Sequence, residues 1–324
     1  MDTNQTKIKH LLHVPFSGLG NYGGWRGENW LRNRIKIFKQ FVIPSLQAQT
    51  NKDFILWVAW RREEKNNPQV KELKKYLDDI GMPNVFTYSG ICFYDDKYED
   101  SVARERLINA LQGAMGDVIN TIGKCEYVIM QIQPSDDVYH RNAIKVIQTA
   151  FKEGDFEAVG FKKGYICNYQ TKEVREYNPL TSPPFYAIKF PRSVFIEPLE
   201  HCKYTSIKHD VGKYKAGTPI PSHEWVGDAL NYLQIDHRDF CVGVHSDNIS
   251  TQFNNPFAGD YVSSEVLKNF GLENVEPLQI PFSLGRLVFK KMPYSWKRKL
   301  RYLAGEKKWI GRSLFSIIYN FLRS

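Results

Sequence analysis

The chain of 324 residues is 42% hydrophobic and 14% aromatic, which is enough to bury a sizeable core in one large domain or two smaller ones. It contains no uninterrupted apolar run of about 20 residues, and the polar segment 1–10 lacks the pattern of a signal peptide, so we expect neither a membrane span nor a secreted protein. Five widely spaced cysteines without a CxxC pair argue against a disulfide framework and a zinc site, and favour a cytoplasmic protein.

The formal net charge of +9 is concentrated at one end of the sequence. Residues 286–324 contain eleven Lys or Arg and a single acid, Glu306, so residues 1–285 are close to neutral. This tail is also rich in apolar and aromatic residues, a combination that suits a helix at the inner, anionic surface of a membrane. A basic helix pair packed on the body explains the composition equally well. Nucleic-acid binding ranks lower, because no recognition motif accompanies the charge.

Up to about residue 155 the sequence alternates between the patterns of strands and helices. We expect strands over residues 9–14, 54–60, 85–88 and 126–132, and helices over residues 31–42, 70–80, 104–115 and 142–151. Pro44 should end the first helix, since proline resists helix continuation. Repeated strand–helix units of this kind predict a parallel sheet with helices on both faces and with ligands at the carboxyl ends of its strands.

Beyond residue 155 the pattern changes to short, aromatic segments separated by turn residues. We expect strands over residues 158–161, 164–169, 174–177 and 185–190, and these suggest an antiparallel addition to the sheet. The glycines between residues 17 and 24 match neither a Walker loop nor a dinucleotide fingerprint, and we interpret that segment as a mobile loop.

Two adjacent carboxylates, Asp136 and Asp137, follow the apolar strand pattern of residues 126–132. A strand that ends in this way presents hard oxygen ligands at the edge of a sheet, where Mg²⁺ or Mn²⁺ would in turn hold a diphosphate. The alternative is that residues 135–137 cap a helix starting near Val138, because Ser and Asp are preferred at that position.

Several segments together resemble a known family. The run from Arg34 to Phe54 contains Pro-Ser-Leu-x-x-Gln-Thr-x-x-x-Phe, and it is followed by the Ser-Asp-Asp of residues 135–137, by Ser-Pro-Pro-Phe at 182–185 and by Val-His-Ser-Asp-Asn-Ile-Ser at 244–250. Over about residues 8–255 the chain resembles bacterial rhamnosyltransferases of the GT-A glycosyltransferase type. The resemblance implies an α/β fold of the GT-A kind, a Rossmann-like mixed sheet flanked by helices. Residues 1–285 would form the transferase domain, with a nucleotide-sugar half at 1–155 and an acceptor half at 156–285, and residues 286–324 a basic amphipathic helical tail.

The resemblance implies transfer of a sugar from a nucleotide-diphosphate sugar to a surface-polysaccharide or lipid-linked acceptor, with inversion and with Mn²⁺ or Mg²⁺ as the cofactor. One departure matters, because the family carries Asp-x-Asp-Asp where this chain has Gln133-Pro134 before its aspartates. The loss of one acid keeps two alternatives open, a catalytically degenerate scaffold at the membrane and a metal-dependent phosphohydrolase.

The resemblance also assigns roles at the metal. Asp137 would be a direct ligand, and Asp136 would bind through water or contact the donor. His245, after the apolar run 240–244, would return from a strand end to complete the coordination, for which imidazole suits Mn²⁺ better than Mg²⁺. A loop histidine bonded to backbone is the alternative.

Further roles fall on the acceptor and the diphosphate. Glu224, with Asp228 in reserve, would be the general base beside Trp225, where partial desolvation raises a carboxylate pKa. Alternatively, these acidic residues have no catalytic role and stand at a helix N-terminus, where negative charge is favourable. The arginines that would bind the diphosphate are Arg26, Arg104 and Arg106. Pro15 and Phe16, near the first strand, would line the pocket for the nucleotide base. For Arg104 a solvated helix face remains open.

Overall fold

The computed structural model describes residues 8–17, 28–88, 116–180, 183–196, 226–245 and 253–279. Several expectations therefore lie outside the described residues, namely the helix at 104–115, the tail at 286–324, and Arg26, Arg104, Arg106, Glu224 and Trp225. The backbone of Asp228 lies in a short helix, and its side chain is outside the description.

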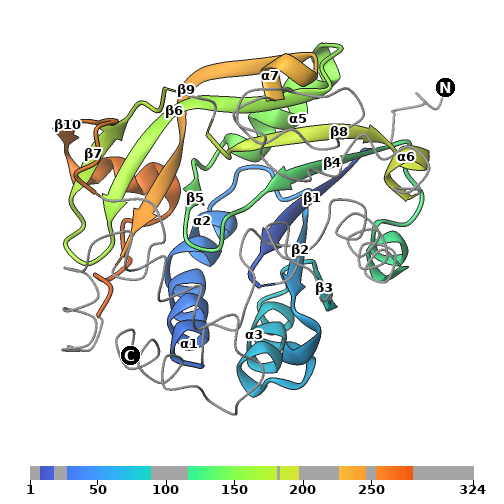
Figure 1. Ribbon diagram of the computed structural model, residues 1–324, viewed down its shortest axis with the longest axis horizontal. Coiled ribbons are helices and arrows are strands. Elements are labelled where there is room, and N and C mark those ends of the chain that lie inside the picture. Colours follow the sequence, from blue (N-terminus) through green and yellow to red (C-terminus); the bar gives the residue numbers. More distant parts are fainter. Residues whose placement is uncertain are drawn as a thin grey trace, which may run out of the picture.

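A single mixed sheet organises the molecule (Figure 1). Its strands are β1 (Ile8–Pro15), β2 (Ile55–Trp60), β3 (Asn84–Tyr88), β4 (Tyr127–Ile132), β5 (Val138–Tyr139), β6 (Ala158–Asn168), β7 (Val174–Tyr177), β8 (Tyr186–Pro191), β9 (Tyr232–Val244) and β10 (Ala258–Val262). Their order is β10-β7-β6-β8-β4-β1-β2-β3, and β9 pairs with both β5 and β6. The β4-β1-β2-β3 part is parallel, whereas β8 joins β4 and β6 in antiparallel fashion.

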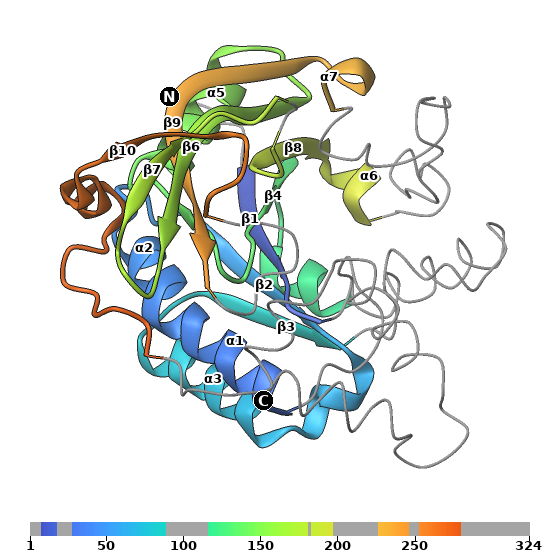
Figure 2. The ribbon, with the colours of Figure 1, turned by 60° about the vertical axis from the view of Figure 1, so that its left-hand side comes forward.

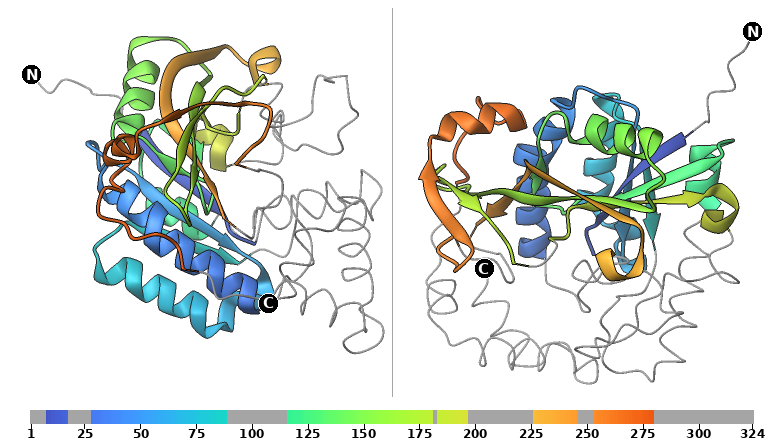
Figure 3. Two further views of the ribbon diagram at one scale, coloured as in Figure 1. Left: turned by 90° about the vertical axis from the view of Figure 1, so that its left-hand side faces the viewer. Right: turned by 90° about the horizontal axis from the view of Figure 1, so that it is seen from above.

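Helices cover both faces of this sheet. They include α1 (Glu28–Ile37), α2 (Ile43–Gln47), α3 (Pro68–Asp79), α5 (Ala143–Glu153), α6 (Arg192–Ile196) and α7 (Val226–Ala229), with 3₁₀ turns at Arg62–Asn66 and Ser264–Phe270. Residues 116–122 are helical as well. Figure 2 shows α1 and α3 lying together on one face. In the left view of Figure 3, α1, α3 and α5 lie on one side of the sheet and α7 on the other. The mixed α/β architecture predicted from the alternating patterns is therefore confirmed.

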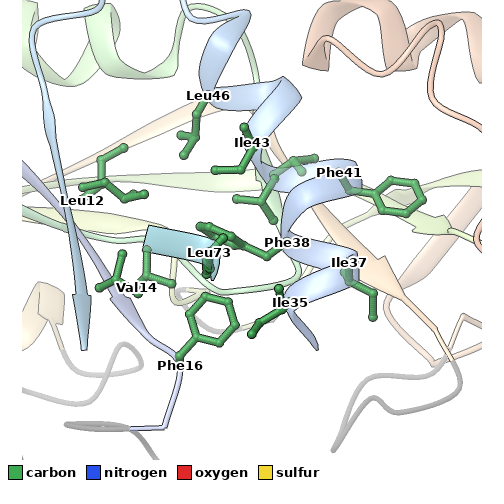
Figure 4. Packing of buried hydrophobic residues seen from close by; sticks show 14 of the residues in the cluster. Leu12, Val14, Phe16, Ile35, Ile37, Phe38, Phe41, Ile43, Leu46 and Leu73 are labelled. Atoms are coloured by element: carbon green, nitrogen blue, oxygen red, sulfur yellow. The ribbon is translucent and has the colours of Figure 1, made fainter. Parts of the chain in front are cut away.

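The core beneath α1 and α2 is strongly aromatic. Figure 4 shows Phe38 and Ile35 pointing toward Val14 and Phe16 of the β1 segment, whereas Phe41 points away from β1. The Phe16 ring stacks on Trp60 at a centroid distance of 4.4 Å and meets Phe38 edge-on at 5.0 Å. Such ring pairs add to the free energy gained from burial alone, and they fix the helical turn that follows α1 against the end of β1.

Two predicted boundaries are wrong. The first helix does not end at Pro44, because a π-helical turn at Phe38–Val42 joins α1 to α2 and Pro44 stands at the start of α2, where its missing N–H costs little. The strands expected at 158–161 and 164–169 form one continuous β6. A Cβ at Gly164 would lie 2.5 Å from the Phe240 ring, so this glycine marks the close approach of β9 rather than a turn.

Candidate functional site

The aspartates follow the carboxyl end of β4, as predicted. The Gln133 N–H donates to the His13 carbonyl at 2.8 Å, which carries the pairing with β1 one residue further. The Gln133 side-chain amide then donates to the carbonyl oxygens of Pro134 and Asp137, both at 2.9 Å. Gln133 thus holds together the turn that presents the two aspartates.

No helix begins after this turn. Val138 and Tyr139 form β5 and pair with Cys241 and Phe240 of β9, while α5 begins only at Ala143. The interpretation of Ser135, Asp136 and Asp137 as a helix cap is therefore wrong, because the residues they would cap are in a strand.

The sheet brings His245 to the aspartates. β9 runs in the same direction as β4, since β8 is antiparallel to both β4 and β6, and β9 is parallel to β6. Both carboxyl ends consequently meet at one edge, where the Nε2 atom of His245 lies 3.1 Å from Oδ2 of Asp136. The His245 side chain is fully buried and that of Asp136 is 17% exposed. His245 thus lies beside Asp136 at this edge, and the role of the two residues as metal ligands stays a prediction.

A buried cation, Arg34 of α1, contacts the same carboxylate. Its guanidinium forms an ion pair with Oδ2 of Asp136, and the Arg34 side chain is 6% exposed. Burial disfavours the charged carboxylate, but the charge of Arg34 and the contact with His245 outweigh it, so the pKa of Asp136 lies below its ordinary value. Asp136 is therefore an ionised group enclosed by two basic side chains.

Asp137 faces a different partner. Its Oδ1 atom accepts the backbone N–H of Gly243 at 2.8 Å, which ties the turn to the end of β9 two residues before His245. Burial and the neighbouring charge of Asp136 raise the pKa of Asp137 well above its ordinary value. The two aspartates differ accordingly, since Asp136 is paired with the side chains of Arg34 and His245, and Asp137 with a backbone N–H.

Tyr169 and Gly243 hold the aspartate turn against the end of β9. The Tyr169 hydroxyl donates to the Asp136 carbonyl at 2.8 Å, its N–H donates to the Val244 carbonyl at 2.9 Å, and its ring stacks on Phe41 at 3.8 Å. A Cβ on Gly243 would lie 2.2 Å from the Asp136 carbonyl oxygen, so only glycine permits this approach of β9 to the turn.

Other predicted site residues are placed as follows. Pro15 ends β1 and is partly buried, while the Phe16 ring is 5% exposed and packs in the core on Trp60 and Phe38. The described residues thus give Phe16 a packing role, and the base-pocket role stays a prediction.

Arg34 was not identified as a site residue from the sequence, although a signal was present. Trp30, Arg34 and Phe38 follow one another at intervals of four residues on the buried side of the helix. A cation in the middle of an apolar stripe requires a buried partner, because an unpaired charge is too costly to bury. That pattern would have indicated a carboxylate opposite the helix.

The described residues supply only part of the coordination shell of a divalent cation. In the segments that the structure describes, no three His, Cys, Asp or Glu side chains are grouped so as to hold a metal ion. The pair formed by Asp136 and His245 supplies one carboxylate and one imidazole, a donor set compatible with Mn²⁺. Cations of this class often take only one or two protein carboxylates and complete their shell with water and substrate phosphates. The pair formed by Asp136 and His245 fits a cation whose remaining ligands are water and substrate phosphates.

Within the described segments, no helix has both the length and the apolar character needed to cross a bilayer.

Comparison with known families and structures gave similarities of limited extent. Residues 27–80 match the model of a family described as putative rhamnosyl transferase. No curated protein was found to match the sequence. Among solved structures, Staphylococcus aureus TarS 1–349 in complex with UDP-GlcNAc is 12% identical, with a TM-score of 0.37 over 73% of this chain and 59% of that one. The chain thus spans about three fifths of the length of that TarS fragment.

Two further structures are similar to the same degree. TarS 1–349 in complex with UDP is 11% identical, with a TM-score of 0.38 over 92% of this chain and 81% of that one. A putative nucleotide-diphospho-sugar transferase from Desulfovibrio desulfuricans G20 is 14% identical, with a TM-score of 0.32 over 72% and 82%. The family match is the more specific finding, because it covers Arg34 and the run from Pro44 to Phe54. The resemblance to rhamnosyltransferases expected from the sequence is confirmed for residues 27–80 of this chain.

Proposed function

We propose that the protein is a glycosyltransferase that moves a sugar from a nucleotide-diphosphate sugar to a hydroxyl group of a surface-polysaccharide or lipid-linked acceptor. The meeting of Asp136 and His245 at the carboxyl edge of the sheet is the observation that carries this proposal. Ligands of open α/β sheets bind at that edge, and the family match over residues 27–80 supports the same class of enzyme.

The side chains would divide the work as follows. Asp136 and His245 would hold Mn²⁺ or Mg²⁺ together with the donor diphosphate. When bound, the cation would act as a Lewis acid that stabilises the charge developing on the departing nucleotide diphosphate. Asp137 would keep the turn joined to β9 through Gly243, so that Asp136 and His245 stay in register.

The transfer itself would proceed with inversion. A general base, Glu224 or Asp228, would take the proton of the acceptor hydroxyl as its oxygen bonds to the anomeric carbon and the bond from that carbon to the diphosphate oxygen breaks. Arg26, Arg104 and Arg106 would hold the diphosphate by charge-assisted hydrogen bonds, and Trp225 would line the sugar pocket.

The test is the metal-dependent binding of nucleotide diphosphates. Thermal unfolding of the full chain is measured with UDP, GDP or dTDP, each with and without Mn²⁺, for the wild type, Asp136→Asn and the exposed control Asp236→Asn. We expect a metal-dependent rise of the melting temperature with one nucleotide in the wild type and the control, and none in Asp136→Asn. If none of the nucleotides shifts the melting temperature, the scaffold alternative is favoured. Phosphoester cleavage without an acceptor would favour the phosphohydrolase.

The basic tail would keep the enzyme near a membrane where lipid-linked acceptors are made. Residues 286–324 combine eleven Lys or Arg with a single acid, and each cation near an anionic surface contributes about 1 kcal/mol. Deletion of residues 291–324 should release the protein from anionic liposomes in a flotation assay, and full flotation of the truncated chain would contradict this role.

A further inference from the structure

Arg34 forms an ion pair with the carboxylate oxygen that the proposed metal site requires. Its guanidinium pairs with Oδ2 of Asp136, the same atom that lies 3.1 Å from Nε2 of His245. Its carbon Cζ lies 5.5 Å from the centre of the Trp30 ring, a cation–π contact that restrains the side chain from the other side. The site therefore contains a positive charge of its own before any metal arrives.

The cluster has little negative charge to offer a divalent ion. Gln133 and Pro134 contribute no carboxylate, and Oδ1 of Asp137 is engaged by the Gly243 N–H. Asp136 is the remaining carboxylate beside His245, and its charge is already balanced by Arg34. A divalent ion that enters such a site meets a neighbouring guanidinium, and like charges at short range repel strongly where water is scarce.

We propose that Arg34 is a resident counter-cation that competes with the divalent ion for Asp136, so that the ion binds tightly only together with the diphosphate of the donor. The negative charge of the diphosphate attracts both cations and removes the conflict between them. This inference rests on the proposed function and adds to it an energetic coupling between metal and nucleotide, which by linkage is the same in both directions.

Variants of Arg34 isolate this coupling. In Arg34→Gln the competing charge is gone, and in Arg34→Lys it remains as a point charge that cannot form the planar fork of arginine. Arg32 on the same helix is exposed and bonds only to Asn29 among the described residues, so Arg32→Gln is the matched control. Asp136→Asn removes the carboxylate for which the two cations compete.

The experiment measures the dissociation constant of Mn²⁺ on the full chain by electron paramagnetic resonance, first with Mn²⁺ alone and then with the nucleotide diphosphate that binds best. For the wild type and Arg32→Gln we expect weak binding of Mn²⁺ alone and at least tenfold tighter binding with nucleotide. Arg34→Gln should bind Mn²⁺ alone at least tenfold more tightly than the wild type, which removes most of the coupling. Arg34→Lys should lie between them, and Asp136→Asn should bind least.

A second measurement covers the case in which Arg34→Gln is too unstable to purify in the metal-free state. Because a ligand of the folded state stabilises it by mass action, Mn²⁺ should raise the melting temperature of Arg34→Gln and Arg34→Lys more than that of the wild type. If the Mn²⁺ affinity and the melting-temperature rise of both variants equal those of the wild type, Arg34 is a structural partner of Asp136 and the inference is overturned. Since Mn²⁺ alone is used in this comparison, its outcome does not depend on whether any nucleotide binds.

Discussion

The Tyr169 hydroxyl donates a hydrogen bond of 2.8 Å to the backbone carbonyl of Asp136, and so reaches from the end of β6 to the turn that carries the candidate metal ligand. The same residue bonds through its N–H to Val244, next to His245. Tyr169 therefore links the two chain segments of the site, one through its fully buried side chain and the other through its backbone.

Replacement of Tyr169 by phenylalanine should weaken this link without disturbing the ring stacking on Phe41. A buried carbonyl that loses its donor costs about 1–3 kcal/mol, so we expect a loss of about 1–2 kcal/mol in the free energy of unfolding and weaker nucleotide binding. Urea denaturation and a nucleotide titration measure both. Tyr165→Phe is the control, because its hydroxyl has no hydrogen bond within the described part of the chain. Equal losses in the two variants would show that the bond to Asp136 has no special role.

Gly243→Ala should separate β9 from the aspartate turn. The added Cβ would lie 2.2 Å from the Asp136 carbonyl oxygen and 2.4 Å from the Tyr169 ring, and neither neighbour can move away independently. Overpacking of this kind costs about 1–3 kcal/mol, and we expect Mn²⁺-dependent nucleotide binding to be lost as His245 is displaced. At Gly116 a Cβ would meet no atom of the described residues within 4 Å, so Gly116→Ala should leave stability and binding unchanged. Unaltered binding in Gly243→Ala would argue against the close approach.

The parts of the site that were predictable from the sequence are those carried by local patterns. A strand pattern ending in Asp136 and Asp137, and a second one ending before His245, were enough to predict that both lie at strand ends. Their contacts were not predictable, because the pairing of β9 with β6 and the continuous β6 depend on how Gly164 and Gly243 admit neighbouring segments. Arg34 was overlooked for a related reason, since the partner that explains its burial is about a hundred residues away in the chain.

The local patterns also misled at two points, and both have physical causes. Proline ends a helix only where its missing N–H and its ring disrupt an existing turn, and the π-helical turn before Pro44 removes that conflict. The Ser-Asp-Asp sequence has the composition of a helix cap, yet the two residues after it pair with β9. Long-range strand pairing therefore overrode a local preference worth about 1 kcal/mol.

Buried histidines predict a loss of stability in acid. Burial lowers the pKa of His13 to about 4 and that of His10 to about 3, whereas an unfolded histidine titrates near 6.5. The unfolded chain therefore binds protons that the folded chain does not, so this stability is fully present above pH 6.5 and is lost as the pH falls toward 4. From pH 7.5 to pH 5 each histidine should cost about 2 kcal/mol.

Urea denaturation at the two pH values tests this expectation. His13→Leu should lose about 2 kcal/mol less than the wild type on acidification, because the ring that resists protonation is gone. His237 is 75% exposed, and His237→Gln should follow the wild type. An unchanged pH dependence in His13→Leu would mean that His13 is protonated in the folded protein.

Variants of Asp137 distinguish whether this residue is a direct metal ligand or a positioning residue. Asparagine retains a side-chain oxygen that can accept the Gly243 N–H, while alanine removes it. If Asp137 positions β9, Asp137→Asn keeps Mn²⁺ binding within about threefold of the wild type, and Asp137→Ala loses about 1–3 kcal/mol of stability because a buried N–H is left without an acceptor. The dissociation constant of Mn²⁺ and the melting temperature, measured together with Asp136→Asn, decide the matter. Equal loss of Mn²⁺ binding in Asp137→Asn and Asp136→Asn would instead make Asp137 a direct ligand, the role that the family resemblance implies.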